Sequence, residues 1–458
     1  MTVCLALATM ALAMAAPDIY VLETHLDVWD LSVEDINGNG HKDLVAITYD
    51  DKEDPDTKHL VAFLQQDDGS YRSRPDVRMA LDPAYGALFW AQVGEHPVRS
   101  LVAVSSTRAT VMRLHEGQFV VTGRTEFNSL VPEGARRLRF LPHAAQDLTG
   151  DGFDEWLIPM PTGYAARNLD GLVAEIPVNV FSEARGGDRG GLQVRYSYPS
   201  HQVFEPPDTD SKSIVFLTDE YADFVYGEDW SQQRRFPIPA VQDDQWSADV
   251  QLRDINANGL PDLIVTQTAG SVNITVVTRV YLATGPYEYP DEPDATFETE
   301  GAFATPVIID VDGDGQLDIA QLKVPYSVGS FVNYFLRRRL TVQAEVYLFK
   351  DGSFSTSPDF STSFPIDAPD GRRSVAYTIG DFNGNGRADV AFGASGDELV
   401  VHTGDPNDFL SRRPWQTLNI PSFGRAEAHD LRNDGKDELI IYHPDTELAK
   451  KIHVVAFP

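Results

Sequence analysis

Residues 310–318 read DVDGDGQLD, and five other stretches of the chain repeat this pattern. The five are DINGNGHKD (35–43), DLTGDGFDE (147–155), DINANGLPD (254–262), DFNGNGRAD (381–389) and DLRNDGKDE (430–438). All six begin with Asp, have Asn or Asp at position 5 and Gly at position 6, and end with Asp or Glu at position 9. A unit that recurs at intervals of tens of residues indicates a repeat architecture.

Short apolar runs rich in β-branched residues flank these acidic stretches. TPVIID (305–310) precedes one copy, and DLVAIT (43–48) and DVAFGA (389–394) belong to two others. Each run is typical of a buried strand. Further along, QDDGSY (66–71) and KDGSF (350–354) have the composition of hairpin turns. The repeating unit is therefore strand, acidic loop, strand, connection, strand, Gly turn, strand, which predicts an all-β fold made of four-stranded antiparallel propeller blades.

The spacing of the copies predicts seven blades. The interval between 35 and 147 has room for a degenerate unit that begins at ALFWAQV (87–93) and lacks the acidic loop. The interval between 147 and 254 is expected to hold one enlarged blade, because 200–247 contains no clear further copy. Only two strands follow the last acidic loop, so DIYVLETHL (18–26) is expected to complete the last blade and cover its open edge.

The alternating oxygen-bearing side chains of the acidic loops suit Ca²⁺, which takes six to eight oxygen ligands. Four carboxylates within nine residues repel one another and favour a bound counter-ion. An EF-hand is excluded because position 12, where it needs an acid, is never acidic in the six copies. The alternative is a set of Asx turns that bind no metal, since Asp, Asn and Gly favour turns in any case.

The candidate calcium ligands occupy the same positions in every loop. The side chains at positions 1, 3, 5 and 9 are Asp35, Asn37, Asn39, Asp43, Asp147, Thr149, Asp151, Glu155, Asp254, Asn256, Asn258, Asp262, Asp310, Asp312, Asp314, Asp318, Asp381, Asn383, Asn385, Asp389, Asp430, Asp434 and Glu438. The position-7 residues, which offer a main-chain carbonyl, are His41, Phe153, Leu260, Gln316, Arg387 and Lys436. The loop at 310–318 is expected to bind most tightly, whereas Arg432 stands at position 3 of the last loop, where its cation can replace the ion.

These repeats resemble those of a known family. DxDGDGxxD followed by an apolar strand, repeated around a propeller, resembles the FG-GAP/VCBS repeats of the integrin α-subunit β-propeller and its bacterial secreted relatives. The resemblance implies structural Ca²⁺ ions in the loops and ligand recognition on the opposite face. It implies no particular activity, because this kind of propeller serves adhesion modules, lectins and some polysaccharide lyases.

Three segments are expected to be insertions on that opposite face, at 159–171, 200–247 and 324–340. Aromatic and Arg side chains are typical of interaction surfaces. The candidate partner-binding residues in these segments are Tyr164, Tyr221, Tyr226, Trp230, Tyr326, Phe331, Tyr334, Arg337 and Arg338. The alternative is that the aromatic side chains pack the insertions onto the propeller.

Composition restricts the location and the partners. The net charge of −32 argues against nucleic acid and anionic membrane surfaces as partners. Residues 1–15 are apolar and end in Ala13-Met14-Ala15, which predicts a signal peptide, a secreted or periplasmic protein, and a single domain from 16 to 458. No later run is long and apolar enough to predict a membrane span, and a monomer is expected.

These features favour a secreted, calcium-binding module that recognises a protein or a glycan. One alternative is a polysaccharide lyase or hydrolase, and another is a structural envelope protein without a small ligand. The sequence contains no HExxH, no GxSxG after a strand and no P-loop, so no catalytic residue is nominated and a non-enzyme is favoured.

Overall fold

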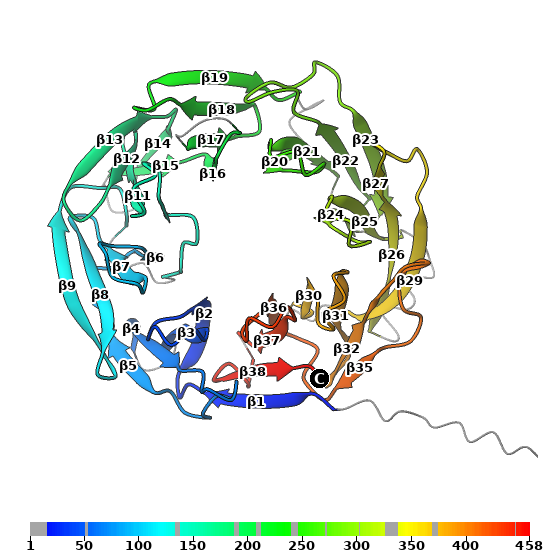
Figure 1. Cartoon of the computed structure of the whole chain (residues 1–458), viewed down its shortest axis with the longest axis horizontal. Coiled ribbons are helices and arrows are strands. Elements are labelled where there is room, and N and C mark those ends of the chain that lie inside the picture. Colours follow the sequence, from blue (N-terminus) through cyan, green and yellow to red (C-terminus); the bar gives the residue numbers. More distant parts are fainter. Residues whose placement is uncertain are drawn as a thin grey trace, which may run out of the picture.

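The computed structural model describes residues 16–50, 54–132, 138–186, 192–207, 212–239, 246–270, 273–301, 303–325, 338–368, 374–444 and 446–458. Throughout these ranges the regular structure is β-strand, arranged as eight four-stranded antiparallel sheets in a ring (Figure 1). No helix long and apolar enough to cross a membrane is found within them. The predicted signal peptide, 1–15, lies outside the described residues.

Each sheet is one blade, and blades 1 to 8 follow the chain. Blades 1 and 2 consist of β2 (Asp27–Glu34), β3 (Asp43–Asp50), β4 (Asp54–Phe63), β5 (Val77–Ala80), β6 (Ala87–Ala91), β7 (Ser100–Val104), β8 (Arg108–His115) and β9 (Gln118–Glu126). Blades 3 and 4 consist of β10 (Ala145–Gln146), β11 (Glu155–Met160), β12 (Gly163–Arg167), β13 (Leu172–Pro177), β16 (Ser200–Phe204), β17 (Ser213–Leu217), β18 (Tyr221–Tyr226) and β19 (Gln232–Pro237).

Blades 5 to 8 complete the ring. Blades 5 and 6 consist of β20 (Ser247–Arg253), β21 (Asp262–Ala269), β22 (Ile274–Tyr281), β23 (Ala295–Gly301), β24 (Phe303–Ile309), β25 (Asp318–Val324), β26 (Arg339–Tyr347) and β29 (Phe360–Asp367). Blades 7 and 8 consist of β30 (Tyr377–Gly380), β31 (Asp389–Ser395), β32 (Glu398–His402), β35 (Gln416–Leu418), β36 (Arg425–His429), β37 (Glu438–Tyr442), β38 (Lys451–Ala456) and β1 (Asp18–Glu23).

Three two-stranded ribbons stand beside the blades. They are β14 (Phe181–Gly186) with β15 (Leu192–Ser197), β27 (Phe349–Lys350) with β28 (Ser353–Phe354), and β33 (Gly404–Asp405) with β34 (Asp408–Leu410). In every blade the first strand lines the central channel and the fourth lies at the rim (Figure 1).

The core lies between the blades rather than within them. Eight clusters of buried side chains are found among the described residues, and each joins two neighbouring blades. In β3, Leu44 and Ala46 pack toward blade 8, while Val45 and Ile47 pack toward blade 2. Because alternate residues of a strand face opposite sides, a strand between two blades must be apolar at consecutive positions.

The prediction of seven blades is wrong, because the described residues form eight. Residues 200–237, expected to belong to one enlarged blade, form the complete blade β16–β19. Two features hid this blade in the sequence. Its first connection, EPPDTDSK (205–212), has no Gly, and its fourth strand is polar and mostly exposed.

Two of the three expected insertions are therefore parts of blades. Residues 159–171 contain the end of β11, the whole of β12 and the turn into β13, and 200–247 contains blade 4 and the start of β20. The third, 324–340, does connect the second and third strands of blade 6. Its residues 326–337 lie outside the described residues.

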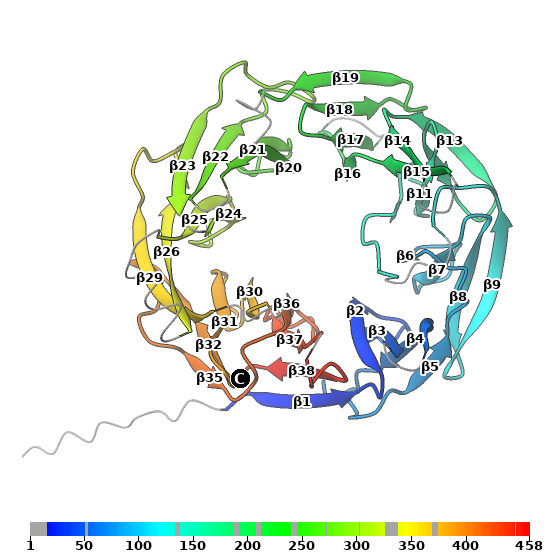
Figure 2. The same cartoon turned by 180° about the vertical axis from the view of Figure 1, so that it is seen from behind.

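The ring closes as the sequence predicts. β1 pairs with β38 in antiparallel register from Asp18 opposite Ala456 to Glu23 opposite Lys451. Figure 2, the view from behind, places β1 on the outer side of β38. The N-terminal strand thus supplies the fourth strand of blade 8 and covers an edge that would otherwise be open.

A buried histidine pair lies in this closing blade. His443 follows β37 and is fully buried, and His453 lies in β38 and is 9% exposed. The Nδ1 of His443 lies 2.7 Å from the carbonyl oxygen of Phe423, so Nδ1 carries the proton and Nε2 accepts from Nδ1–H of His453 at 3.0 Å. Burial and the neighbouring His443 lower the pKa of His453 to about 4, and burial lowers the pKa of His443 as well.

Acid is therefore expected to weaken the closing blade. The ordinary pKa of His is about 6.5. Between pH 6.5 and 4 this side chain is therefore protonated in the unfolded chain and neutral in the folded protein. The stability from the neutral pair is complete above pH 6.5 and falls as the pH drops toward 4, by about 3 kcal/mol. Denaturant unfolding of the wild type and His453→Phe across this range should give a difference that shrinks with acid, whereas His115→Gln, at an exposed histidine, should follow the wild type. Parallel curves for wild type and His453→Phe would contradict this expectation.

Candidate functional site

The six acidic loops occupy one structural position. Each joins the first strand to the second strand of its blade, in blades 1, 3, 5, 6, 7 and 8. Neighbouring loops touch along that face of the ring. Asn433 Nδ2 donates to the carbonyl oxygen of Gly40 at 3.0 Å, and the main-chain N–H of Asp381 donates to Asp437 at 2.8 Å. The loops of blades 7, 8 and 1 are thus joined to one another on this face.

The first Asp of each loop shapes the turn. In the loop at 310–318, Asp310 Oδ1 accepts the N–H of Gly313 at 2.7 Å and Oδ2 accepts that of Gly315 at 2.9 Å. Gly315 has a φ of 87°, and position 6 has a positive φ in all six loops. This left-handed conformation favours Gly, which explains the residue at that position. At position 4, Ala257 adopts a φ of 55° where four other loops have Gly.

The acid at position 9 is a buried clamp. Asp318 is 1% exposed, and its oxygens accept the N–H of Val311 at 2.9 Å and of Phe349 at 2.8 Å. Asp43 and Asp262 make the same pair of bonds, to their own loop and to the residue two positions after the third strand. The carboxylate therefore ties the loop to the backbone at the end of the third strand.

Burial and charge disfavour ionisation of these clamps when no cation is bound. Burial raises the pKa of Asp318 to about 7; the two backbone hydrogen bonds oppose this rise, and the charges of Asp312 and Asp310 add to it. Burial likewise raises the pKa of Asp43 to about 7 and those of Asp262 and Asp389 to about 6. A divalent cation beside these groups would favour their charged forms.

The loop at 310–318 brings three carboxylates together. One ligand oxygen from each of Asp310, Asp312 and Asp314 lies within 4.8 Å of the others, and no other group of three His, Cys, Asp or Glu side chains among the described residues does the same. Asp312 Oδ1 is buried and has no hydrogen-bond partner in the described structure. Lys350 Nζ approaches the other oxygen, Oδ2, at 3.5 Å. Hard oxygen donors around an unsatisfied buried oxygen fit Ca²⁺.

The six loops share one hydrogen bond but differ in the side chains that they could offer to a metal. The main-chain N–H of the position-7 residue donates to the position-5 side chain in every loop, for example His41 to Asn39 and Arg387 to Asn385, each at 2.9 Å. Asn383 Nδ2 donates to both oxygens of Asp389, at 3.1 and 2.9 Å, so in this loop the amide nitrogen faces the clamp. The loop at 310–318 remains the one that has a carboxylate at each of positions 1, 3, 5 and 9.

In the last loop an arginine takes the place of a ligand, as the sequence suggests. Arg432 Nε lies 2.6 Å from Glu438 Oε1 and 3.8 Å from Asp434 Oδ2. The aliphatic part of this side chain also approaches Gly69 of blade 1, whose position would hold a Cβ only 3.1 Å from Arg432 Cδ. The guanidinium thus neutralises the buried Glu438, which is 2% exposed, at the junction of blades 8 and 1.

An Arg432→Asp variant is expected to depend on calcium at this loop. Without calcium it should lose about 3 kcal/mol, because Glu438 keeps its buried charge and loses its partner. With millimolar calcium much of this loss should be recovered, since the loop then has four acids. Urea unfolding of the variant in EDTA and in CaCl₂ measures both effects. Arg412→Asp, at a side chain that is 92% exposed, is the control and should change little. Equal stability of Arg432→Asp in both buffers would contradict the expected rescue.

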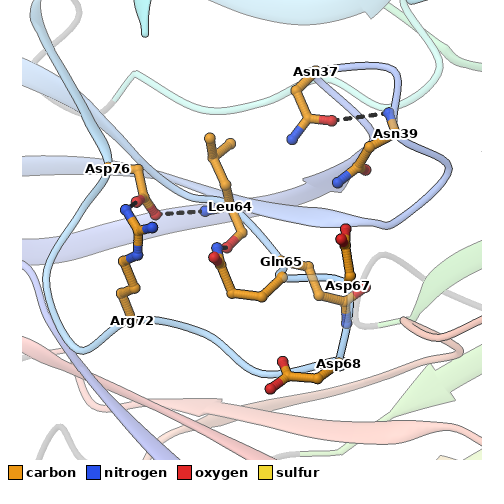
Figure 3. Close-up of a pocket in the computed structure, with 9 residues that line it drawn as sticks. Asn37, Asn39, Leu64, Gln65, Asp67, Asp68, Arg72 and Asp76 are labelled. Atoms are coloured by element: carbon orange, nitrogen blue, oxygen red, sulfur yellow. Dashed lines mark hydrogen bonds and ion pairs between the residues drawn. The ribbon is translucent and has the colours of Figure 1, made fainter.

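A hollow adjoins the loop of blade 1 on the same face. Asn37 and Asn39 lie on one side of it and Asp67 and Asp68 on the other, as Figure 3 shows. Arg72 pairs with Asp76 at 2.9 Å at its edge. Gln65 also lines the hollow; it is 2% exposed, and its Oε1 has no hydrogen-bond partner in the described structure. The hollow belongs to the acidic face and places further oxygen donors beside the amide-rich loop.

The candidate partner residues have different surroundings in the structure. Tyr164 and Trp230 are 7% and 4% exposed and pack in the core between blades 3 and 4, so neither presents its ring to a partner. Tyr226 stacks on Tyr287 with ring centroids 4.2 Å apart, and Tyr221 lies under the guanidinium of Arg235 at 3.7 Å. Arg338 is exposed, and the residues that lie outside the described ranges are Tyr326, Phe331, Tyr334 and Arg337.

The structure has two surfaces that the sequence analysis did not predict. The first follows β13 into the ribbon β14–β15. Of the eleven large apolar side chains that are exposed in the described part of the chain, the ribbon has three, Phe181, Val194 and Tyr196. Two more, Leu172 and Val173, lie at the start of β13, at the end of blade 3 that is near its acidic loop. A groove of about 650 Å³ separates the base of the ribbon from the turn between β17 and β18. Because this turn joins the second and third strands of blade 4, the groove lies on the face opposite the acidic loops.

The second missed surface is a cavity of about 440 Å³ on the channel side of blades 8, 1 and 2. The segment around Phe140 runs inside the first strand of blade 2, where Leu141 N–H donates to the carbonyl of Leu88 at 2.8 Å and Phe140 N–H donates to Asp30 at 2.9 Å. Asp30, Glu34 and Glu427 line the cavity, and Glu34 pairs with Arg99 at 3.3 Å. Burial raises the pKa of Asp30 and Glu34.

Comparison with known protein families gives a match over two of the acidic loops. The sequence profile of the FG-GAP-like repeat family matches residues 254–320, which include the loops of blades 5 and 6. The search of the curated proteins found no match. Among solved structures, BBS1N in complex with ARL6DN is similar at 11% identity and a TM-score of 0.39, and the match covers 97% of this chain and 96% of that one.

Two other structures cover the chain to a similar extent. The Vibrio cholerae biofilm matrix protein Bap1 has 12% identity and a TM-score of 0.33, over 97% of this chain and 88% of that one. The Dos1 propeller has 8% identity and a TM-score of 0.45, over 96% and 94%. The family profile over 254–320 and the ring of four-stranded blades together show that the chain is a β-propeller that contains FG-GAP-like repeats.

Proposed function

We propose that this protein is a calcium-fastened interaction module that binds a protein partner on the face opposite its acidic loops. The observation that carries the binding role is the exposure of apolar side chains on the ribbon β14–β15, where Phe181 is 68%, Val194 45% and Tyr196 36% exposed. Val194 and Tyr196 lie on one face of the ribbon and Phe181 on the other, and a cluster of exposed apolar side chains on one element is typical of an interaction site. Export from the cytoplasm would give the loops access to extracellular calcium and remains part of this proposal.

Calcium has a fastening role in this proposal. Asp310, Asp312 and Asp314 would hold the ion in blade 6, together with the main-chain carbonyl of Gln316, and the orphaned Oδ1 of Asp312 supports this assignment. A bound Ca²⁺ would neutralise the clustered carboxylates and stabilise the connection between β24 and β25. The amide-rich loops, with fewer charges, would bind more weakly.

Calcium is expected to raise the melting temperature. The native loops bind the ion and the unfolded chain does not, so calcium at tenfold the Kd adds about 1.4 kcal/mol for each occupied site. Differential scanning calorimetry in EDTA and in millimolar CaCl₂ measures the shift, with MgCl₂ as the control ion because Mg²⁺ suits such loops less well. Coincident transitions in EDTA and CaCl₂ would exclude the fastening role.

The binding surface requires a separate test. We expect a Phe181→Ser, Val194→Ser double variant to lose protein partners that the wild type retains in affinity capture. Tyr377→Ser is the matched control, because Tyr377 is 64% exposed but lies in the first strand of blade 7, across the ring (Figure 1). A glycan array run in parallel tests the other class of ligand. Retention of the same partners by the double variant would remove this surface from the proposal.

A further inference from the structure

The ribbon β14–β15 is an unusual element of this propeller. Six residue pairs form its ladder, from Phe181 opposite Ser197 to Gly186 opposite Leu192, and no third strand joins it among the described residues. Six residues of strand span about 20 Å. The other two ribbons are short turns of two or three residues a strand. A two-stranded ribbon of this kind is at best marginally stable in water without a further strand or a packed layer.

Both faces of the ribbon meet solvent near its base. Val194, Arg195, Tyr196 and Ser197 are all exposed although they alternate between the two faces. Phe181 is 68% exposed. A strand that is covered on one face would instead alternate between buried and exposed residues. The ribbon therefore has neither a hydrophobic layer beneath it nor a neighbour along its edges in the described structure.

The edges carry little protection against pairing. Natural edge strands are guarded by Pro, by charged side chains, most often Lys, or by bulges. The charged residues of the ribbon are Glu183, Arg185 and Arg195. FSEARG and LQVRYS contain neither Pro nor Lys, and the register of the ribbon runs without a bulge. Glu183 stands opposite Arg195, so the charges of that pair balance. The main-chain groups along these edges form a template for a further strand.

The groove at the base of the ribbon adds a charge preference. Phe181 and Ser197 form one wall, and the turn Leu217–Tyr221 forms the other. Asp219 and Glu220 are exposed on this turn. The nearby cation Arg235 is held by both oxygens of Asp223 at 2.5 Å. The groove therefore presents the negative charges of Asp219 and Glu220 at the base of the ribbon, in a chain whose net charge is −32.

We propose that an extended, basic segment of a partner polypeptide adds to the ribbon β14–β15 as a third strand and places its cationic residues in the groove beside Asp219 and Glu220. Main-chain hydrogen bonds along the edge would supply affinity, and the carboxylates would select the sign of the charge. This inference rests on the proposed function, since it specifies how a protein partner uses the surface named there.

A synthetic peptide tests the inference directly. The probe is a fluorescein-labelled peptide of about eight residues that alternates Val and Lys, long enough to cover one strand of the ribbon. The controls are the same peptide with Glu in place of Lys, and the Lys peptide with alternate amides N-methylated along one edge. Fluorescence anisotropy should give a Kd about tenfold lower or better for the Lys peptide than for either control.

Variants of the protein separate the contribution of the groove's charge from that of the ribbon's apolar surface. Asp219→Asn with Glu220→Gln should weaken the Lys peptide by about tenfold and reduce its preference over the Glu peptide. Phe181→Ser should weaken both peptides, and Tyr377→Ser should weaken neither. Equal affinity for the Lys and Glu peptides in the wild type would overturn the charge assignment.

Hydrogen exchange decides whether a strand is added. With the Lys peptide bound, alternate amides of β14 or β15 should exchange at least about tenfold more slowly, because their N–H groups gain acceptors. If Phe181→Ser weakens the peptide while the ribbon amides exchange as before, strand addition is overturned and the proposed binding surface stands. If Phe181→Ser binds the peptide as well as the wild type and no amide is protected, both strand addition and the proposed binding surface are overturned. Protection produced by a neutral oligosaccharide and not by the peptide would replace the polypeptide with a glycan.

Discussion

A Leu22→Asp substitution is expected to open the ring. Leu22 is fully buried in β1, opposite Ile452 of β38, and packs in the cluster between blades 8 and 1. An unpaired carboxylate in that position would cost more than about 4 kcal/mol, and detaching β1 is the way to avoid the cost. β38 would then become an exposed edge, and the variant should unfold at lower denaturant concentration and release an N-terminal fragment early in limited proteolysis.

The same strand offers a matched control. Ile19 also lies in β1, opposite Val455, but is 41% exposed. Ile19→Asp places the same charge in the same strand where water reaches it, so it should change the free energy of unfolding by less than about 1 kcal/mol. Similar stabilities for the two variants would mean that β1 does not hold the ring closed.

An Asp318→Ala substitution is expected to lose about 4 kcal/mol even in EDTA. The variant leaves the buried N–H groups of Val311 and Phe349 without acceptors, and each unsatisfied group costs about 1–3 kcal/mol. The expected loss does not require a metal, because these hydrogen bonds form within the chain. Urea unfolding in EDTA measures it.

Asp314→Ala separates the clamp from the ligand. Among the described residues, only Gln316 donates hydrogen bonds to the exposed Asp314, so the loss of this side chain should matter little in EDTA. In millimolar calcium Asp314→Ala should lose most of the stabilisation that the ion gives to the wild type at this loop. If Asp318→Ala is as stable as Asp314→Ala in EDTA, the clamp contributes nothing to the fold.

The repeat made most of the fold predictable. Gly at position 6 and the apolar strand after position 9 identified blades 1, 3, 5, 6, 7 and 8, and the apolar run at 87–93 identified blade 2 without an acidic loop. The closure by β1 followed from counting strands. Blade 4 was missed because its first connection has lost the Gly-containing pattern and its rim strand, QQRRFP, is polar where it faces water.

The sites were predictable only where their chemistry is local. The carboxylates at 310, 312 and 314 are close in sequence, and the structure brings them together. The clamp at Asp318 was not predictable, because one of its partners, Phe349, is supplied by the end of a distant strand. Tyr164 and Trp230 were candidates for the partner surface or for packing, and they pack in the core, because aromatic content alone does not distinguish a core from an interface. The exposure of Phe181 depends on the absence of a covering layer, which no local pattern records.

Direct calcium titration of the wild type and Asp312→Asn tests the central claim, that the loop at 310–318 is the tightest of a set of calcium fasteners. Isothermal titration of calcium-free protein should give binding on the order of 10⁻⁴–10⁻³ M, and Asp312→Asn should weaken the tightest site by at least about tenfold. Asp430→Asn, in the loop where Arg432 takes the place of a ligand, should leave that site unchanged. No binding at millimolar calcium, or identical isotherms for the wild type and Asp312→Asn, would contradict the account.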